Sequence, residues 1–189
     1  MRIDEKVLLI MKYTSNNNMV EGKTLLQKTI YFVNEQLHLG ISFSPYYYGP
    51  YSSLVTSAIE EMKQVGAIEE EVERFPFDPF IQNYEPKLYK YKINKFGNRL
   101  FNIIESKHKN DAKEISNAVK EIKEASKKDY KVLSIAGKMY NILKSVKKRM
   151  TSNDIIKEAE FLNWNISKNE AKSAIKFLKD LGFIETRNS

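Results

Sequence analysis

Hydrophobic residues recur at helical spacing through the first third of the chain. Residues 3–13 carry them at i, i+4, i+5 and i+8, residues 23–39 carry them on one helical face, and Gly40 ends the second segment. A third helix is predicted over residues 51–65, because a proline precedes it and Gly66 follows it. These spacings predict three consecutive helices, each with one apolar face.

Two short segments with alternating hydrophobicity come next. Residues 67–74 and 88–93 have this pattern, which is typical of strands. Pro76 and Pro79 lie between them and exclude a regular strand interior there. Three helices followed by a two-stranded ribbon are typical of a winged helix-turn-helix unit, which we assign to residues 1–94.

The helical pattern resumes after the ribbon. Asn94 is expected to cap a helix over residues 95–108, and two further helices are predicted over 111–128 and 130–148. The apolar stripes of the last two are narrow, which suits helices that pair with each other or with a second subunit. We therefore assign residues 95–129 to a helical linker and candidate dimerisation element.

The C-terminal end contains another block of two helices and a strand. Residues 151–154 form a capping run at the start of the first helix, Ser167 caps the second, and residues 183–186 are predicted to be a strand. We assign residues 130–189 to a second, basic winged-helix unit. The predicted fold class is thus mainly α with small β wings, in which two or three helices join two winged helix-turn-helix units.

An internal repeat supports two related units. Residues 57–69 (SAIEEMKQVGAIE) and 173–185 (SAIKFLKDLGFIE) are identical at seven of 13 positions, at a fixed offset of 116. Gly66 and Gly182 stand where a chain that leaves a helix takes a left-handed conformation. The alternative is chance similarity between the ends of two amphipathic helices.

Composition excludes several classes of protein. The chain has 189 residues, of which 42% are hydrophobic and none is cysteine. That is enough apolar material for one or two cores, and it leaves no disulfide or thiolate zinc site. No apolar run approaches the roughly 18 residues of a membrane span, and the N-terminus lacks the features of a secretory signal. We expect a cytoplasmic protein without membrane contact.

Charge is distributed unevenly along the chain. Residues 1–85 hold 7 basic and 12 acidic residues, a net charge of −5, whereas residues 86–189 hold 24 and 12, a net charge of +12. Such an asymmetry indicates that the C-terminal half meets a polyanion. The alternative is that its lysine-rich helices are simply solvated.

The last predicted helix concentrates positive charge on one face. Lys168, Lys172 and Lys176 recur every four residues, outside the apolar stripe. Polar residues beside them can reach base edges, but no arginine is present on this helix to contact guanine, so the signal for sequence specificity is weak. The candidate DNA contacts, which include a basic segment upstream, are Lys168, Asn169, Lys172, Ser173, Lys176, Lys147, Lys148 and Arg149.

The N-terminal unit has the opposite character. Its third helix and first ribbon strand are rich in glutamates, including Glu60, Glu61 and Glu69, which repel phosphate. An aromatic loop and the predicted wing instead supply residues typical of protein interfaces. The candidate partner-binding residues are Tyr46, Tyr47, Tyr48, Tyr51, Phe75, Phe77 and Phe80. The alternative is that about half of these aromatic residues close the small core.

We find no catalytic constellation in the sequence. His38 and His108 are the only histidines, and neither belongs to a metal-binding motif. Residues 22–24 (GKT) resemble the end of a phosphate-binding loop, but Asn17 stands where the leading glycine belongs and no strand is predicted before it. We predict a non-enzymatic protein with no cofactor and no metal site.

Two segments resemble a known family. Residues 25–32 (LLQKTIYF), Phe43 and residues 49–52 (GPYS) are similar to the LQK-hydrophobic-hydrophobic-YF helix and the YGP turn of Panacea (SocA-like) and YwgA-like proteins. Residues 91–97 (YKINKFG) resemble the end of many winged-helix wings. The resemblance covers about residues 3–105. It implies a helical, winged-helix-related domain with protein partners, since Panacea domains are known as antitoxin modules and proteolysis adaptors.

Two functional hypotheses follow from these patterns. The preferred one is a non-enzymatic winged-helix DNA-binding protein, a transcriptional regulator whose C-terminal unit contacts DNA and whose N-terminal unit serves partner or self association. The alternative is a protein-interaction module, antitoxin-like or adaptor-like, that acts through the aromatic N-terminal loop and wing. We expect a homodimer in either case.

Overall fold

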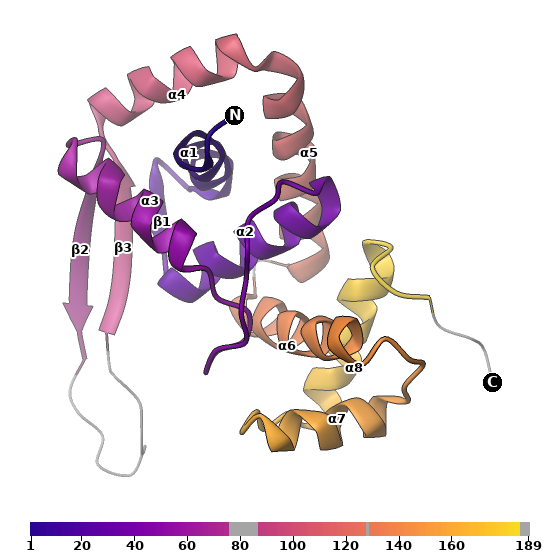
Figure 1. The fold of residues 1–189 in the computed structure, drawn as a ribbon. Helices are drawn as coiled ribbons and strands as arrows, with labels where there is room; N and C mark the ends of the chain where they lie inside the picture. Colours follow the sequence, from indigo (N-terminus) through magenta and orange to yellow (C-terminus); the bar gives the residue numbers. More distant parts are fainter. Residues whose placement is uncertain (76–86, 128, 186–189) are drawn as a thin grey trace.

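A computed structural model describes residues 1–75, 87–127 and 129–185, which form eight helices and one three-stranded antiparallel sheet (Figure 1). The helices are α1 (Ile3–Thr14), α2 (Lys23–Leu37), α3 (Ser53–Gln64), α4 (Lys95–Lys107), α5 (Lys109–Ser126), α6 (Tyr130–Val146), α7 (Ser152–Phe161) and α8 (Lys168–Asp180). The strands are β1 (Met19–Glu21), β2 (Ile68–Arg74) and β3 (Lys87–Ile93), in the order β1-β3-β2. The predicted helices and the predicted ribbon are therefore confirmed.

The sheet contains one strand that the sequence pattern did not predict. β1 pairs with the C-terminal half of β3, with Val20 opposite Tyr91, and both side chains are buried. Three residues are too few to display an alternating pattern, so this strand is recognisable only from its partner. β1 ties the connection between α1 and α2 to the ribbon.

The two long strands of the ribbon carry opposite charge. β2 is acidic and β3 is basic, and Glu69 pairs with Lys92 at 3.7 Å while Glu73 pairs with Lys90 at 2.8 Å. Counting the net charge separately for residues 1–85 and 86–189 therefore assigns β2 and β3, which pair with each other, to different halves. With the three lysines of β3 counted on the N-terminal side, residues 1–94 have a net charge of −2 and residues 95–189 have +9. The asymmetry persists, but it is smaller than a cut at residue 85 suggests.

The junction between the ribbon and α4 is closely packed. The Asn94 side chain caps α4 by accepting hydrogen bonds from the backbone N–H groups of Phe96 and Gly97. A Cβ at Gly97 would lie 2.2 Å from the carbonyl oxygen of Ala67, in the turn between α3 and β2. Only glycine allows α4 to begin this close to that turn.

Helices α4 and α5 wrap around α1 (Figure 1). The apolar stripe of α5, which includes Ile115, Val119 and Ile122, is buried against α1 and α2 of the same chain. This stripe is covered without a second subunit, so it no longer argues for dimerisation through residues 95–129. A homodimer stays a prediction.

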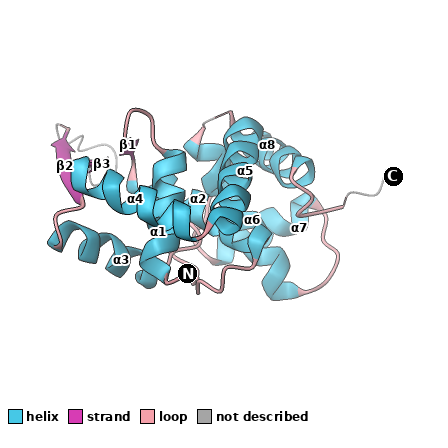
Figure 2. Ribbon diagram, turned by 90° about the horizontal axis from the view of Figure 1, so that it is seen from above, coloured by secondary structure: helices cyan, strands magenta, loops and turns pink. Residues whose placement is uncertain are grey.

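Helices α6, α7 and α8 pack against one another as a three-helix unit and also against the N-terminal part (Figure 2). Phe32 on α2 meets Phe177 on α8 with ring centroids 4.9 Å apart. One hydrophobic core therefore runs from Val7 on α1 to Leu178 on α8. The three-helix unit does not have a core of its own that is separate from α2.

The two copies of the internal repeat end their helices in the same way. Gly66 and Gly182 have φ values of +72° and +73°. In each copy the residue after the glycine donates its backbone N–H to a carbonyl five residues earlier, from Ala67 at 2.8 Å and from Phe183 at 2.9 Å. The repeated sequence thus encodes a repeated helix end.

The copies diverge immediately afterwards. Ile68 starts β2, which pairs with β3, but residues 183–185 form no strand, and Thr186 lies outside the described residues. The prediction of a strand is wrong over residues 183–185. The Phe183 ring packs between Phe32 and Tyr140, at centroid distances of 5.4 and 5.1 Å, so the chain is held by ring packing instead of strand pairing.

Candidate nucleic-acid interface and tyrosine loop

The predicted DNA contacts on α8 are all exposed. We call Lys168, Lys172 and Lys176 the lysine face, and Asn169 and Ser173 lie beside it on the solvent side of the helix. Ala171, Ala174, Phe177 and Leu178 face the core on the opposite side. The helix starts with a capping box, in which Ser167 accepts from the Glu170 N–H and the Glu170 carboxylate accepts from the Ser167 N–H.

Two residues of the lysine face line a groove between α7 and α8. The groove has a volume of about 320 Å³, and its lining combines polar and apolar side chains, which are Ser152, Asn153, Ile156, Lys168, Ala171, Lys172 and Ile175. Ser152 and Asn153 form the first turn of α7. The groove therefore places two lysines of α8 beside the N-terminal end of the preceding helix.

The basic segment upstream comes shortly before the groove in the chain. Lys147, Lys148 and Arg149 are exposed in the connection between α6 and α7, where Lys147 ends α6 in a left-handed conformation. Arg149 is three residues from Ser152, which lines the groove. The basic connection thus comes directly before the turn of α7 that faces Lys168 and Lys172.

The acidic groups of this unit are partly engaged. Lys176 is paired with Asp180 at 2.7 Å, so one member of the lysine face has an intramolecular partner that the sequence pattern did not indicate. Hydrogen bonds from Thr151 lower the pKa of Asp154, and hydrogen bonds from Ser167 lower the pKa of Glu170. Those two carboxylates stabilise the starts of α7 and α8.

A second candidate surface lies on the loop between α2 and α3. We call residues 43–52 the tyrosine loop. Ser44 and Tyr51 close it with two backbone hydrogen bonds of 2.9 Å, and the Gly49 N–H donates to the Tyr46 carbonyl at 2.8 Å. Gln27 on α2 makes two further hydrogen bonds of 3.1 Å to the backbone of Ser52.

The C-terminal unit also holds this loop. Ser134 on α6 donates to the Tyr48 carbonyl at 3.1 Å, and the Trp164 indole N–H donates to the Tyr46 carbonyl at 3.0 Å. Trp164 belongs to the turn between α7 and α8 and is itself buried. The tyrosine loop is therefore fixed at both ends and at its tip, by elements from both halves of the chain.

A buried lysine lies beneath the loop. The Lys28 side chain is only 2% exposed and donates to the Pro50 carbonyl at 2.6 Å. Burial, together with the nearby charge of Lys138, lowers the pKa of Lys28 to about 7. Gly49 packs here as well, because a Cβ on it would lie 3.0 Å from Lys138 Cγ. The two segments that resemble the Panacea and YwgA-like pattern thus contact each other.

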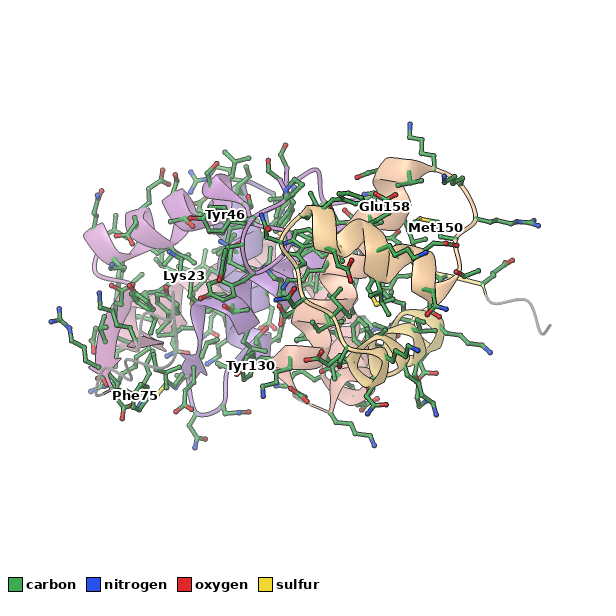
Figure 3. The ribbon with its side chains drawn as sticks, turned by 90° about the horizontal axis from the view of Figure 1, so that it is seen from below. Lys23, Tyr46, Phe75, Tyr130, Met150 and Glu158 are labelled. Carbon is green, nitrogen blue, oxygen red and sulfur yellow. The ribbon has the colours of Figure 1, made fainter. Side chains whose placement is uncertain are left out.

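The tyrosine side chains point outward from this fixed backbone. Tyr46, Tyr47 and Tyr48 are 60%, 53% and 44% exposed. The Tyr46 ring lies against the half-buried Tyr51 ring at 5.1 Å, and the Lys23 ammonium lies 5.9 Å from the Tyr51 ring centre and 5.8 Å from that of Tyr89. Figure 3 shows Lys23 and Tyr46 in the same region of the molecule.

Of the predicted wing residues, the structure describes only Phe75. Phe75 is exposed just after β2 and lies apart from Tyr46 in Figure 3. Phe77 and Phe80 lie outside the described residues. Of the seven predicted partner contacts, the four tyrosines form one surface.

Other candidate chemistry is dispersed. The described residues contain no group of three or more metal-ligating side chains, and none of their helices is long and apolar enough to cross a membrane. β1 does precede residues 22–24, contrary to our expectation, but it is a short antiparallel strand and the Lys23 ammonium lies over aromatic rings. The sequence pattern missed Lys23 and Trp164 as parts of the tyrosine surface, because their partners are distant in the chain.

A scan against protein-family models found no match to this chain, and a search of curated proteins found no significantly similar sequence. The resemblance to Panacea and YwgA-like proteins therefore stays a prediction.

Proposed function

We propose that this protein is a non-enzymatic DNA-binding regulator whose three-helix unit, α6 to α8, acts as a helix-turn-helix. The observation that supports this most directly is the groove between α7 and α8, where Lys168 and Lys172 face the first turn of α7. In helix-turn-helix proteins the second helix of the motif enters the major groove while the first crosses the backbone. α7 and α8 follow one another in this order, and α8 carries the net positive charge that its role needs.

The polar residues on α8 suit different parts of a duplex. Lys168 and Lys172, together with the basic connection before α7, are placed to neutralise phosphates, which positions a protein without reading sequence. Asn169 and Ser173 are exposed next to the lysine face and are suited to base edges. We therefore expect a large electrostatic component and modest sequence preference.

The N-terminal part suits association better than duplex contact. Its order, α1-β1-α2-α3-β2-β3, and the pairing β1-β3-β2 support a winged-helix assignment for residues 1–94. The exposed side of α3, however, presents Glu60 and Glu61, and Lys63 is already paired with Glu60 and Glu70. This helix would repel phosphate, so we assign the N-terminal unit to partner or self association.

The proposal is tested by fluorescence anisotropy with a labelled duplex, titrated from about 50 to about 200 mM salt. Reversing the lysine face (Lys168→Glu, Lys172→Glu and Lys176→Glu) should weaken binding roughly 100-fold or more and reduce the salt slope by about 3. A matched control reverses three exposed lysines on α4 and α5 (Lys95→Glu, Lys109→Glu and Lys113→Glu) and has the same net charge. Equal binding by both variants would overturn the proposal.

A further inference from the structure

The tyrosine loop presents aromatic rings on a backbone that is already ordered. Its carbonyl and N–H groups are bound by Gln27, Lys28, Ser134 and Trp164. Tyr46 rests on Tyr51, so one face of its ring is supported and 60% of the residue is open to solvent. A ligand that stacks on Tyr46 would not have to order the loop first, which removes a large part of the entropic cost of binding.

Positive charge accompanies these rings. Lys23 lies over Tyr51 and Tyr89, and Lys138 lies 5.6 Å from the Trp164 ring centre. Near Lys138 lies the carboxylate of Glu170, which is tied to the N-terminus of α8 by Ser167 and also lies near Lys131. Aromatic rings with ammonium groups between them favour an anionic polymer that carries flat rings of its own.

The loop is also joined to the surface that we assign to DNA. Trp164 holds the Tyr46 carbonyl, and three residues later Ser167 caps α8, the helix that carries the lysine face. Nucleic acid bound along α8 would therefore lie close to the tyrosine loop. This continuity distinguishes the loop from Phe75, which is exposed just after β2 and lies apart from Tyr46 in Figure 3.

We propose that Tyr46 and Tyr47 stack on unpaired bases of nucleic acid whose duplex portion is bound by the three-helix unit. The inference rests on the proposed function and names its substrate class: a duplex with an adjoining single strand. Lys23 contacts the phosphates of the unpaired strand, while Tyr48 borders the stacked bases. Stacking of a base on an aromatic side chain is sequence-tolerant and changes affinity by roughly 5- to 150-fold.

The test compares two labelled DNAs that share one duplex, one with blunt ends and one with a single-stranded extension of about ten nucleotides. The protein should bind the extended DNA at least about fivefold more tightly. Tyr46→Ala with Tyr47→Ala should abolish this preference, whereas Tyr46→Phe with Tyr47→Phe should retain it. Phe75→Ala is the matched control for loss of an exposed ring, and thermal unfolding confirms that each variant is folded.

The outcomes separate this inference from the proposed function. If the blunt duplex is bound through the lysine face but the extension adds nothing, the inference is overturned and the proposed function stands. If the extended DNA is bound through the tyrosines while reversal of the lysine face has no effect, the proposed function fails and the stacking role stands. If neither DNA binds at about 50 mM salt, both are wrong, and the tyrosine loop is a surface for a protein partner.

Discussion

The buried Lys28 amine makes the stability of this protein depend on pH in a way that one substitution can test. Its pKa falls from 10.5 to about 7 on folding, because the side chain is buried and lies near Lys138. Between these two values the unfolded chain holds a proton that the folded chain lacks, so raising the pH favours folding. The difference of about 3.5 pKa units corresponds to roughly 5 kcal/mol over the whole range.

Lys28→Met removes the titrating group and keeps a similar length of side chain. At pH 7 the variant escapes a penalty of about 4 kcal/mol. It loses the hydrogen bond to the Pro50 carbonyl, which leaves a buried acceptor unpaired and costs about 1–3 kcal/mol. We therefore expect the variant to be about 1–3 kcal/mol more stable than the natural protein at pH 7, and this advantage to shrink by about 3 kcal/mol by about pH 9.5.

The assay is urea unfolding of both proteins at several pH values between about 7 and 9.5, with the free energy of unfolding extrapolated to water. Tyrosines and other lysines titrate in both proteins and cancel in the difference. Lys113→Met on the exposed side of α5 is the control, and its curve should stay parallel to that of the natural protein. Parallel curves for Lys28→Met as well would refute the reasoning, since they would mean that the folded chain keeps this amine charged.

Two further predictions concern the packing of the chain. Gly97→Ala should destabilise the protein by about 1–3 kcal/mol in urea unfolding, because the new Cβ would lie 2.2 Å from the Ala67 carbonyl oxygen. This cost exceeds the gain from the better helix propensity of alanine. Unchanged stability would show that the turn between α3 and β2 moves aside easily. The isolated segment 130–189 should show no cooperative thermal transition by circular dichroism, because Phe177 and Phe183 lose their contact with Phe32. A sharp transition would show instead that the three-helix unit folds independently.

The helices could be predicted because their signals are local. Asn94, Thr151 and Ser167 each cap a helix through a side-chain hydrogen bond, as their positions before apolar runs predict. The glycine that ends α3 and the one that ends α8 both have positive φ, which the repeated sequence indicates. Such features depend on a few neighbouring residues, so the sequence contains them in full.

The strands and buried polar groups depend on distant residues. β1 exists because β3 lies beside it, and residues 183–185 form no strand because Phe183 packs on Phe32 and Tyr140. Lys28 gives no sign of burial by its type, since lysine is ordinarily exposed. The sequence predicts one apolar face for this helix, but the structure buries the whole stretch from Leu26 to Asn34, and a helix buried on every side encloses its polar residues.

The two groups of candidate site residues came from different halves of the sequence and supported competing hypotheses, one of DNA binding and one of protein association. In the structure they are parts of one body, because Trp164 and Ser134 bind the backbone of the tyrosine loop and α8 packs on α2 through Phe177 and Phe32. A rigid connection of this kind fixes the distance between the lysine face and the exposed tyrosines. A single extended ligand can then contact both without reordering the chain, whereas two separate partners would have to share the region around the turn between α7 and α8. The geometry thus favours one ligand with both phosphates and flat rings over two unrelated partners.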